Sequence, residues 1–435
     1  MMFSRRAIWK NSVTIVAIVL VVALTSSLAW ADVIAPEQSP SLFKDLLGVS
    51  GTVRTAYFSK DMSYDGQSGF GVGSIWLTAK PEEVLGVKTY FDARVQGQDL
   101  TRSSDLSWEI REGYAETSVR SLDIKVGRQI IVWGRADKIN PTDVWSTRNY
   151  TLLTTDDEDQ RLGVSTLQTA WNQGSFRIIG IWQPEWRTPL IPIPPLPIGV
   201  TVQNLTPTNQ ASQFGLKIDH SGDVDYSLSY AHVIDRTPDL TVISQGSQGV
   251  RAGLQFNSID VFGADAAIVL GDYGIRTEVA YTSTKNPDST DTFVQRSNLF
   301  GVVGVERTFD GELNFNVQYL YKHNFNWQDP SQISDPNVKL LAQQENLASN
   351  QLGSDMHGAS IRISYKAFHE TLEGEIAAVS WLTRGDLALR PKVSYAFSDR
   401  IKAIVGAQLY SGPSDSFFGR LNPVSTVFTE LRVSF

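Results

Sequence analysis

The sequence of 435 residues contains no cysteine, which excludes disulfide-stapled folds, thiolate zinc sites, c-type haem attachment and cysteine nucleophiles. Charged residues are scarce as well, at 19%, where about a quarter is usual in a globular domain. Acidic residues outnumber basic ones by 46 to 38, which argues against a nucleic-acid partner because phosphate binding needs a basic surface. After residue 31 no apolar run is long enough for a membrane helix, and the longest stretch, 190–200, is broken by prolines.

The first 31 residues have the order of a secretory signal peptide. A basic segment that ends at Lys10 precedes an apolar run at 13–24, and Ala29 and Ala31 provide a small-residue cleavage site. Cleavage there removes three of the 38 basic residues and no acidic one, so the mature chain would carry 35 basic against 46 acidic residues, a net charge of −11.

The C-terminal residues alternate between apolar and polar side chains. Leu431, Val433 and Phe435 share one face of an extended strand, whereas Glu430 and Arg432 share the other. A soluble domain rarely ends in such a strand, because its open edge invites aggregation. This ending resembles the C-terminal assembly signal of Gram-negative outer-membrane β-barrels, which implies recognition by the barrel-assembly machinery.

The same period of two recurs along the chain in segments of about ten residues, the length of a strand that crosses a bilayer at a tilt. Very short turns, such as 309–311, alternate with long loops, such as 324–355, an asymmetry typical of outer-membrane barrels. The pattern gives about 18 strands, an even number as in single-chain bacterial barrels. We count 248–257 as a strand and 261–270 as a periplasmic connector, because a strand at 261–270 would move the long loop 284–297 to the short-turn side.

The expected fold class is therefore all-β, a single closed antiparallel transmembrane β-barrel of about 18 strands. The expected organisation is a signal peptide at 1–31, a short periplasmic segment at 32–47 and the barrel at 48–435. This predicts a monomer in the bacterial outer membrane, in contact with lipid and lipopolysaccharide, since one chain supplies all the closing strands.

A more specific motif lies between residues 111 and 144. It includes Gly127, Arg128 and Gln129, then Trp133 and Gly134, and then Asn140, Pro141 and Asp143. The series is similar to the Gly-Arg-Gln, Trp-Gly and Asn-Pro-x-Asp series of outer-membrane porins related to the alginate-export channels. The resemblance implies a monomeric barrel whose charged lumen is narrowed by infolded loops, and it transfers no substrate specificity.

Strict alternation in the strand expected at 122–133 would aim Arg128 at lipid, which costs about 2–4 kcal/mol near the midplane. We therefore predict a register change at Gly127 that returns Arg128 to the lumen. Beyond it, Asn140 and Pro141 form a turn signal. We expect 134–160 to fold inward as a constriction loop, with a solvated outer loop as the alternative for its acidic run. The charged residues assigned to this constriction are Arg135, Asp137, Lys138, Asp143, Arg148, Asp156, Asp157, Asp159 and Arg161.

Alternation assigns more basic than acidic side chains to the lumen, although the whole chain is acidic. The selectivity residues expected there are Arg54, Arg94, Glu112, Glu116, Lys125, Arg128, Arg177, Arg251, Arg276, Arg362, Arg390, Lys392 and Arg432. A basic pore wall concentrates anions. We therefore expect a channel for passive diffusion of small anionic or polar solutes. In the alternative, Arg and Glu pair across neighbouring strands and only hold the lumen open.

Two other functions fit parts of the sequence. The loop at 184–200 combines prolines with apolar residues, and an exposed patch of this kind usually contacts something. Three roles fit it: a plug in the mouth, packing on neighbouring loops, or contact with an apolar substrate, and the last favours transport of hydrophobic compounds. A barrel sheath around an electron-transfer cytochrome is the other, and it would need a wide lumen. The sequence has no nucleophile elbow, zincin helix or phosphate loop, so we expect no enzyme, no cofactor and no metal site. A hydrolase site on the barrel rim is the remaining enzymatic alternative, because such a site is recognised by the geometry of its residues and not by a sequence motif.

Overall fold

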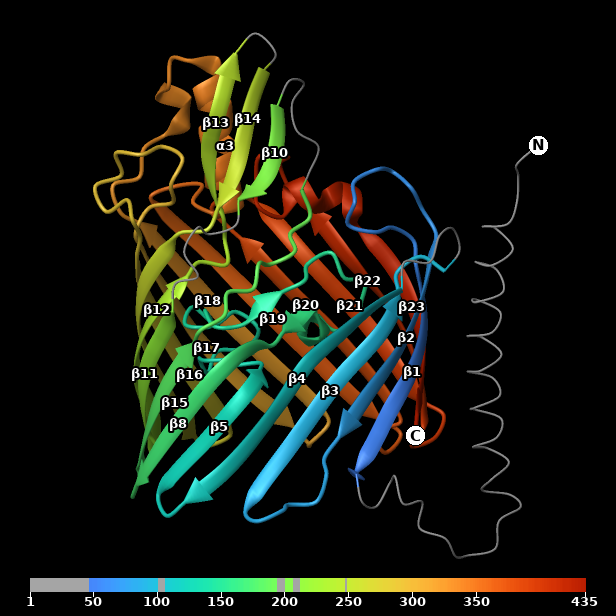
Figure 1. Cartoon of the computed structure of the whole chain (residues 1–435). Coiled ribbons are helices and arrows are strands. Elements are labelled where there is room, and N and C mark those ends of the chain that lie inside the picture. The colour runs from blue at the N-terminus through green and yellow to red at the C-terminus, as the bar shows by residue number, and fades with distance from the viewer. Residues whose placement is uncertain (1–46, 101–105, 194–199, 206–211, 247–248) are drawn as a thin grey trace, which may run out of the picture.

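The computed structural model describes residues 47–100, 106–193, 200–205, 212–246 and 249–435. Its main sheet has 18 strands that form one closed antiparallel barrel (Figure 1), which confirms the fold class expected from the sequence. β1 (Val49–Phe58) pairs on one side with β2 (Phe70–Ala79) and on the other with β23 (Thr426–Ser434), and the second pairing closes the barrel. The predicted signal peptide and almost all of the predicted periplasmic segment lie outside the described residues.

From β1 to β23 the wall follows chain order, with each wall strand paired to the next one. The remaining wall strands are β3 (Val87–Gly97), β4 (Leu106–Val119), β5 (Leu122–Gln129), β8 (Val164–Gln173), β9 (Phe176–Gln183), β11 (Gln213–His220), β12 (Val224–Ile234), β15 (Ser258–Leu270), β16 (Tyr273–Ser283), β17 (Asn298–Phe309), β18 (Leu313–Asn324), β19 (Asp355–Ala367), β20 (Leu372–Trp381), β21 (Asp386–Ala396) and β22 (Ile401–Ser411).

The long connections at the upper end of the barrel carry further elements (Figure 1). They are β6 (Thr147–Arg148), η1 (Asp157–Gln160), β7 (Arg161–Leu162), β10 (Val200–Leu205), β13 (Asp239–Gly246), β14 (Gly249–Gln255), η2 (Pro330–Gln332), α3 (Pro336–Ala348) and η3 (Gly419–Val424). β10, β14 and β13 form a separate three-stranded sheet, the outer sheet, which stands above the barrel beside α3. None of the helices in the described ranges is long and apolar enough to cross a membrane.

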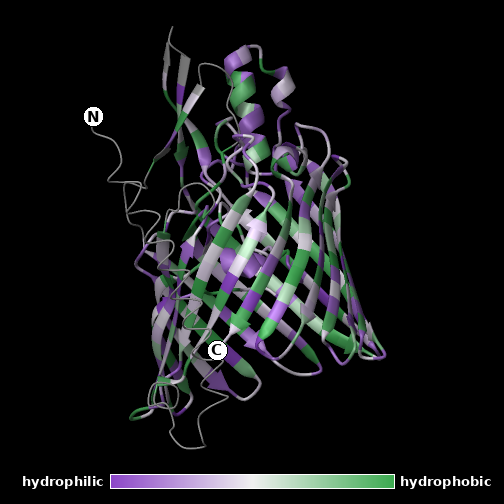
Figure 2. Ribbon diagram, turned by 90° about the vertical axis from the view of Figure 1, so that its right-hand side faces the viewer, coloured by the Kyte–Doolittle hydropathy of each residue, from purple (hydrophilic) through white to green (hydrophobic). Residues whose placement is uncertain are grey.

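The wall strands carry apolar side chains outside and polar side chains inside. In β18, Val317 and Tyr319 are each 48% exposed, whereas the intervening Asn316 and Gln318 are buried. Figure 2 shows hydrophobic and hydrophilic residues alternating along the wall strands in the same way. Such a surface matches lipid on the outside and a polar lumen within.

The C-terminal strand takes part in closure up to its last residue. Phe435 exchanges backbone hydrogen bonds of 3.0 Å with Gly51, and Val433 lies opposite Val53 of β1. Leu431 is 46% exposed, on the apolar face of the strand. The three residues of the predicted assembly signal therefore lie on the seam where the first and last strands meet.

Two neighbouring segments have roles that differ from those that the sequence predicted. β15 is a wall strand paired with β12 and β16, so the interpretation of 261–270 as a periplasmic connector is wrong. The strand predicted at 248–257 is β14, which belongs to the outer sheet, and Arg251 therefore lies outside the barrel wall. The error has a simple cause, since alternation indicates a strand without showing which sheet it joins.

Candidate functional site

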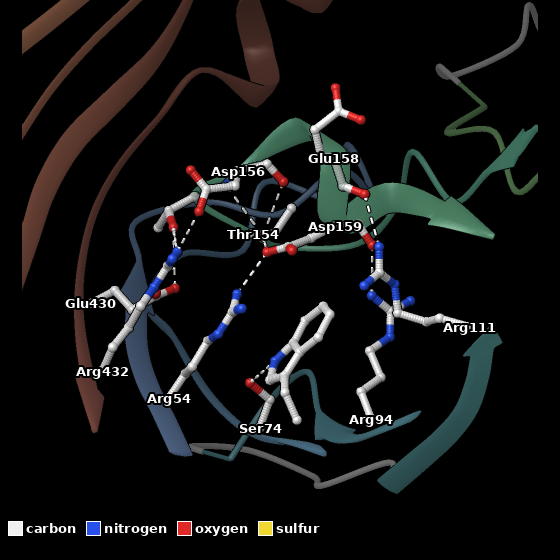
Figure 3. A network of polar contacts seen from close by, with 12 residues as sticks. Arg54, Ser74, Arg94, Arg111, Thr154, Asp156, Glu158, Asp159, Glu430 and Arg432 are labelled. Atoms are coloured by element: carbon white, nitrogen blue, oxygen red, sulfur yellow. Dashed lines mark hydrogen bonds and ion pairs between the residues drawn. The ribbon is translucent and has the colours of Figure 1, made fainter. Parts of the chain in front are cut away.

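The chain between β5 and β8 leaves the wall and crosses the lumen. We call this segment, residues 130–163, the infolded loop; it contains β6, η1 and β7. Its acidic end is held by basic side chains from neighbouring strands of the wall, among them β23 and β1, which pair with each other (Figure 3). Arg54 of β1 forms an ion pair with Asp159 at 2.7 Å, and Arg432 of β23 forms one with Asp156 at 2.6 Å.

Further ion pairs tie the same loop to β19 and β21. Lys392 of β21 forms a second ion pair with Asp156, at 3.1 Å, and Arg390 of the same strand forms one with Asp157. Nearer its start, the loop places Asp137 at 2.7 Å from Arg362. The loop is thus fixed to the wall on several sides, which is the arrangement expected of a constriction.

The pairs at Asp156 are charged over the whole physiological range. Burial alone would raise the pKa of this carboxyl, but Arg432 and Lys392 lower it to about 2. A depressed acid pKa means that the pairs stabilise the fold above the unfolded pKa and are lost only as the pH falls toward 2. Ordinary acidification therefore leaves this end of the loop in place.

The other end of the infolded loop is fixed by one buried carboxylate, Glu278 of β16. Its Oε2 accepts hydrogen bonds from the backbone N–H groups of Arg135 and Ala136, at 3.0 and 3.1 Å. Its Oε1 accepts from the backbone N–H and the hydroxyl of Thr142, both at 2.8 Å. Gly134 has a φ of +95°, and a Cβ there would lie 2.4 Å from the Glu278 carboxylate. This contact explains why the motif needs glycine after tryptophan.

Arg135 is directed to a different group of carboxylates. It is paired with Asp265 of β15 and lies 3.4 Å from Asp219 of β11. Within the loop itself, Arg161 binds Asp143 at 2.6 Å and Arg148 lies 3.9 Å from the same carboxylate. Lys138 is exposed and makes no ion pair in the described part of the chain.

Several residues predicted for the lumen lie beside the infolded loop without a side-chain ion pair to it. Arg94 donates to the carbonyl oxygen of Asp159 at 2.8 Å (Figure 3), and its guanidinium lies 5.2 Å from the Trp76 ring centroid. Glu112 accepts from the backbone N–H of Ile130 at 2.9 Å. These contacts add β3 and β4 to the strands that support the loop.

Other predicted residues form local pairs on the wall. Arg177 lies 3.1 Å from Asp123, and Arg276 lies 2.6 Å from Glu306. The Lys125 ammonium lies 3.6 Å from the centroid of the Tyr114 ring, and Glu116 is opposite Lys125 in the ladder. Most basic side chains assigned to the lumen therefore have an acidic partner, and the wall does not present a continuous free positive charge.

The predicted register change at Gly127 is wrong. The ladders on both sides of β5 run through this residue in step, although Gly127 has a φ of +129°. Arg128 stands where the β4–β5 ladder ends, and its guanidinium reaches Glu109 at 3.8 Å and Glu185 at 3.5 Å. Carboxylates at the upper end of the short strand β5 thus neutralise an arginine that alternation would leave facing lipid.

Two hollows lie on either side of the infolded loop. The outer one, the vestibule, has a volume of about 410 Å³ and extends up to the outer sheet and α3; the inner one has about 500 Å³. Asp157 and Arg390, together with Gln408 and Phe418, line both. The Asp157–Arg390 pair therefore stands at the junction of the two hollows, the position of a constriction.

The roof of the vestibule is fastened by buried carboxylates of the long outer loops. Glu345 of α3 accepts from the backbone N–H of Leu240 at 2.8 Å, and its second oxygen has no partner. Asp239 accepts from the backbone N–H of Gln295 at 2.9 Å and from Asn257 at 2.6 Å. Burial raises the pKa of Asp239 to about 7 and that of Glu345 well above its ordinary value.

We expect this roof to loosen as the pH rises from about 4 to above 7. A raised acid pKa contributes stability that is complete below the unfolded value and is lost as the pH rises through the folded value. The hydrogen-exchange protection factors of 235–246 and 336–348, which are corrected for the intrinsic pH dependence of exchange, should therefore be lower at pH 8 than at pH 5. Glu345→Gln keeps the oxygen that binds Leu240 and removes the charge, so it should slow exchange at pH 8. Glu83→Gln, in an exposed turn, should change nothing; equal protection factors at both pH values would contradict the prediction.

The sequence predicted the infolded loop, but it did not identify the residues of the wall that hold this loop. Glu278 and Asp265 could be placed on an inward face by alternation, yet nothing in the pattern connects them with residues more than a hundred positions away. A Trp-Gly pair followed by an Asn-Pro turn was the available signal that the chain leaves the wall there. The vestibule was not foreseen, because it is assembled from the infolded loop and five further outer connections.

Residues 52–302 match the family model described as "Protein of unknown function (DUF1302)". No curated protein matches the chain. Among solved structures, the barrel is similar to OccAB3 of Acinetobacter baumannii, with a TM-score of 0.52, 13% identity, and coverage of 89% of this chain and 98% of that chain. It is also similar to OccK1 (OpdK) of Pseudomonas aeruginosa, with a TM-score of 0.50, 9% identity, and coverage of 89% and 97%, and to OpdK with vanillate at the same values. At such identities the likeness establishes the fold, that of outer-membrane porin-type channels.

Proposed function

Since the chain belongs to the DUF1302 family, for which no function is assigned, we propose its function from the geometry of its lumen: an outer-membrane channel for passive, substrate-selective diffusion of small polar or anionic solutes. The observation that carries this proposal is the infolded loop. It crosses the lumen, is fixed to the wall by ion pairs, and separates two hollows that meet at Asp157 and Arg390. A passage of this kind selects by size and by the groups at its narrowest point.

The same proposal places the barrel in the bacterial outer membrane as a monomer, since one chain closes the whole sheet. Its apolar exterior would contact lipid and lipopolysaccharide, and its C-terminal strand would be read by the barrel-assembly machinery. Export would use the signal peptide expected at 1–31. The resemblance to alginate-export-type channels remains a hypothesis about the wider superfamily and supplies no substrate.

The charge of the lumen gives at most a modest preference for anions over cations. Carboxylates of the infolded loop neutralise much of the basic wall, so we propose that the barrel itself discriminates weakly between anions and cations. OpdK, which has the same fold, is described with vanillate, and a small organic molecule is the size of solute that we propose here.

A second candidate, transport of hydrophobic compounds, is favoured by one observation. The vestibule is lined by many apolar side chains, among them Leu152, Ile191 and Leu341. A barrel that sheathes a cytochrome gains no such support, since it needs a wide lumen and the infolded loop crosses this one.

Liposome swelling tests the channel proposal directly. We expect the purified full chain to admit acetate, succinate and glucose and to exclude oligosaccharides of several units, because the infolded loop limits the passage. Liposomes that carry the heat-unfolded chain serve as the control. Swelling with none of the small solutes would contradict a passive channel, and free entry of the large ones would contradict a constriction.

A further inference from the structure

The vestibule differs from the rest of the lumen in its combination of apolar surface and uncompensated positive charge. Leu240, Leu254 and Leu341 reach it from the outer sheet and α3, and Leu152 and Phe418 reach it from below. At about 410 Å³ it lies in the range of hollows that hold a drug-sized organic ligand.

Among the described residues that line the vestibule, the basic side chains outnumber the acidic ones by five to one. The basic residues are Lys60, Arg148, Arg236, Arg390 and Arg420, and the acidic residue is Asp157. Arg390 is paired with Asp157, and Arg148 lies 3.9 Å from Asp143. Lys60, Arg236 and Arg420 have no carboxylate partner in the described part of the chain, unlike the basic residues of the wall below.

Of the three, Arg236 has the most side-chain nitrogens without a hydrogen-bond partner in the described part of the chain. Its guanidinium lies 4.5 Å from the centroid of the Trp186 ring, and one terminal nitrogen donates to the carbonyl oxygen of Trp145 at 2.8 Å. Nε and the other terminal nitrogen are buried and have no hydrogen-bond partner among the described residues. Asp235 and Asp143 attract this guanidinium but lie beyond ion-pair distance. Buried donors without partners are costly, and a ligand that brings an anion into contact with them would relieve that cost.

Lys60 and Arg420 extend the positive potential around the same hollow. Lys60 donates to the carbonyl oxygen of Pro423 at 3.2 Å, and the Arg420 guanidinium lies 5.1 Å from the Phe417 ring centroid. The Nε of Arg420 is also buried without a partner. Neutral carbonyls and aromatic rings hold these cations in place and leave their charge uncancelled.

We propose that the vestibule is a binding site for an amphipathic anion, which enters it before it reaches the constriction. Arg236 binds the acidic group, Lys60 and Arg420 add attraction, and the apolar body lies against the leucines of the outer sheet and α3. The inference rests on the proposed function, since it names the class of solute that the channel concentrates at its mouth. It also joins the two candidate functions, because one molecule can be both anionic and apolar.

Titration calorimetry of the purified full chain with adamantanecarboxylate tests the site. We expect saturable binding of this rigid, apolar anion, much weaker binding of the neutral adamantanecarboxamide, and no measurable binding of acetate. Arg236→Met keeps a long apolar side chain on Trp186 and removes the charge, and it should weaken binding at least roughly tenfold, the effect of losing one charge-assisted contact. Lys339→Met removes a cation of α3 that does not line the vestibule, and it should leave binding unchanged.

Three outcomes would overturn the site: equal binding of the carboxylate and the carboxamide, no saturable binding at all, or an Arg236→Met variant that binds like the parent chain. Arg420→Met gives a second reading if Arg236→Met folds poorly, and it too should weaken binding. Calorimetry needs no transport, so a chain that binds adamantanecarboxylate but admits no solute into liposomes would contradict the channel and support the site. A chain that admits solutes but does not bind adamantanecarboxylate would support the channel and contradict the site.

Discussion

Joint replacement of Asp156, Asp157 and Asp159 by asparagine is expected to convert a weakly selective passage into an anion-selective one and to raise its conductance. Arg54 and Arg390 would lose their only carboxylate partners in the described part of the chain, and Arg432 and Lys392 would each lose one. The wall would then present free positive charge along the lumen, which concentrates anions. The infolded loop would also lose its ion pairs to β1, β21 and β23, so the constriction should widen.

Reversal potentials in planar bilayers under a KCl gradient measure the change. We expect the chloride-to-potassium permeability ratio to rise roughly tenfold, the lower end of what a field of one sign achieves. A matched control carries Asp223→Asn, Asp310→Asn and Asp399→Asn, which removes three carboxylates from exposed turns at the other end of the barrel. Because the pKa of Asp156 is lowered to about 2, this carboxylate should keep its charge and its pairs with Arg432 and Lys392 when the pH is lowered to 4. A variant with unchanged selectivity would show that these acids do not govern the lumen charge.

The sequence was sufficient for the barrel because its defining signal is local. Alternation, short turns and long loops each appear within a few dozen residues, and the 18 wall strands follow from them. The wrong assignments of 261–270 as a connector and of 248–257 as a wall strand show the limit of that signal. Both segments alternate, and only the pairing of β15 with β12 and β16, against β14 with β10 and β13, decides which one lies in the wall.

The candidate site could be predicted from the sequence only in part, for a related reason. The inward fold of 134–160 could be expected from its turn residues and charges, whereas its partners lie far away in sequence, as Asp159 and Arg54 do. Alternation predicted a basic lumen, but it wrongly included Arg251 of the outer sheet, and it could not show that the acids of the loop pair with the basic side chains of the wall. Nothing in the sequence pattern identifies Arg236, since the two unpaired nitrogens of its guanidinium are a property of the assembled mouth.

Replacement of Glu278 by alanine should have the largest effect of any single substitution in the lumen. Four hydrogen bonds from Arg135, Ala136 and Thr142 end on this one carboxylate, which is 1% exposed. Alanine would leave three backbone N–H groups and a hydroxyl without an acceptor. Each buried donor left unpaired costs about 1–3 kcal/mol, so the start of the infolded loop should detach from β16.

Detachment at Glu278 differs from loss of the acidic run, because it removes the support of the loop without changing the charges of β1, β21 and β23. Single-channel records of Glu278→Ala should therefore show larger and fluctuating conductance with little change in reversal potential, and the barrel should unfold at a lower temperature. Gly134→Ala should approach the same behaviour from the other side of the contact, since its Cβ would lie 2.4 Å from the carboxylate. Glu312→Gln, in a turn far from the loop, is the control. A steady conductance like that of the parent chain would mean that the ion pairs at Asp156, Asp157 and Asp159 hold the loop without Glu278, and the acidic end alone would then set the size of the passage.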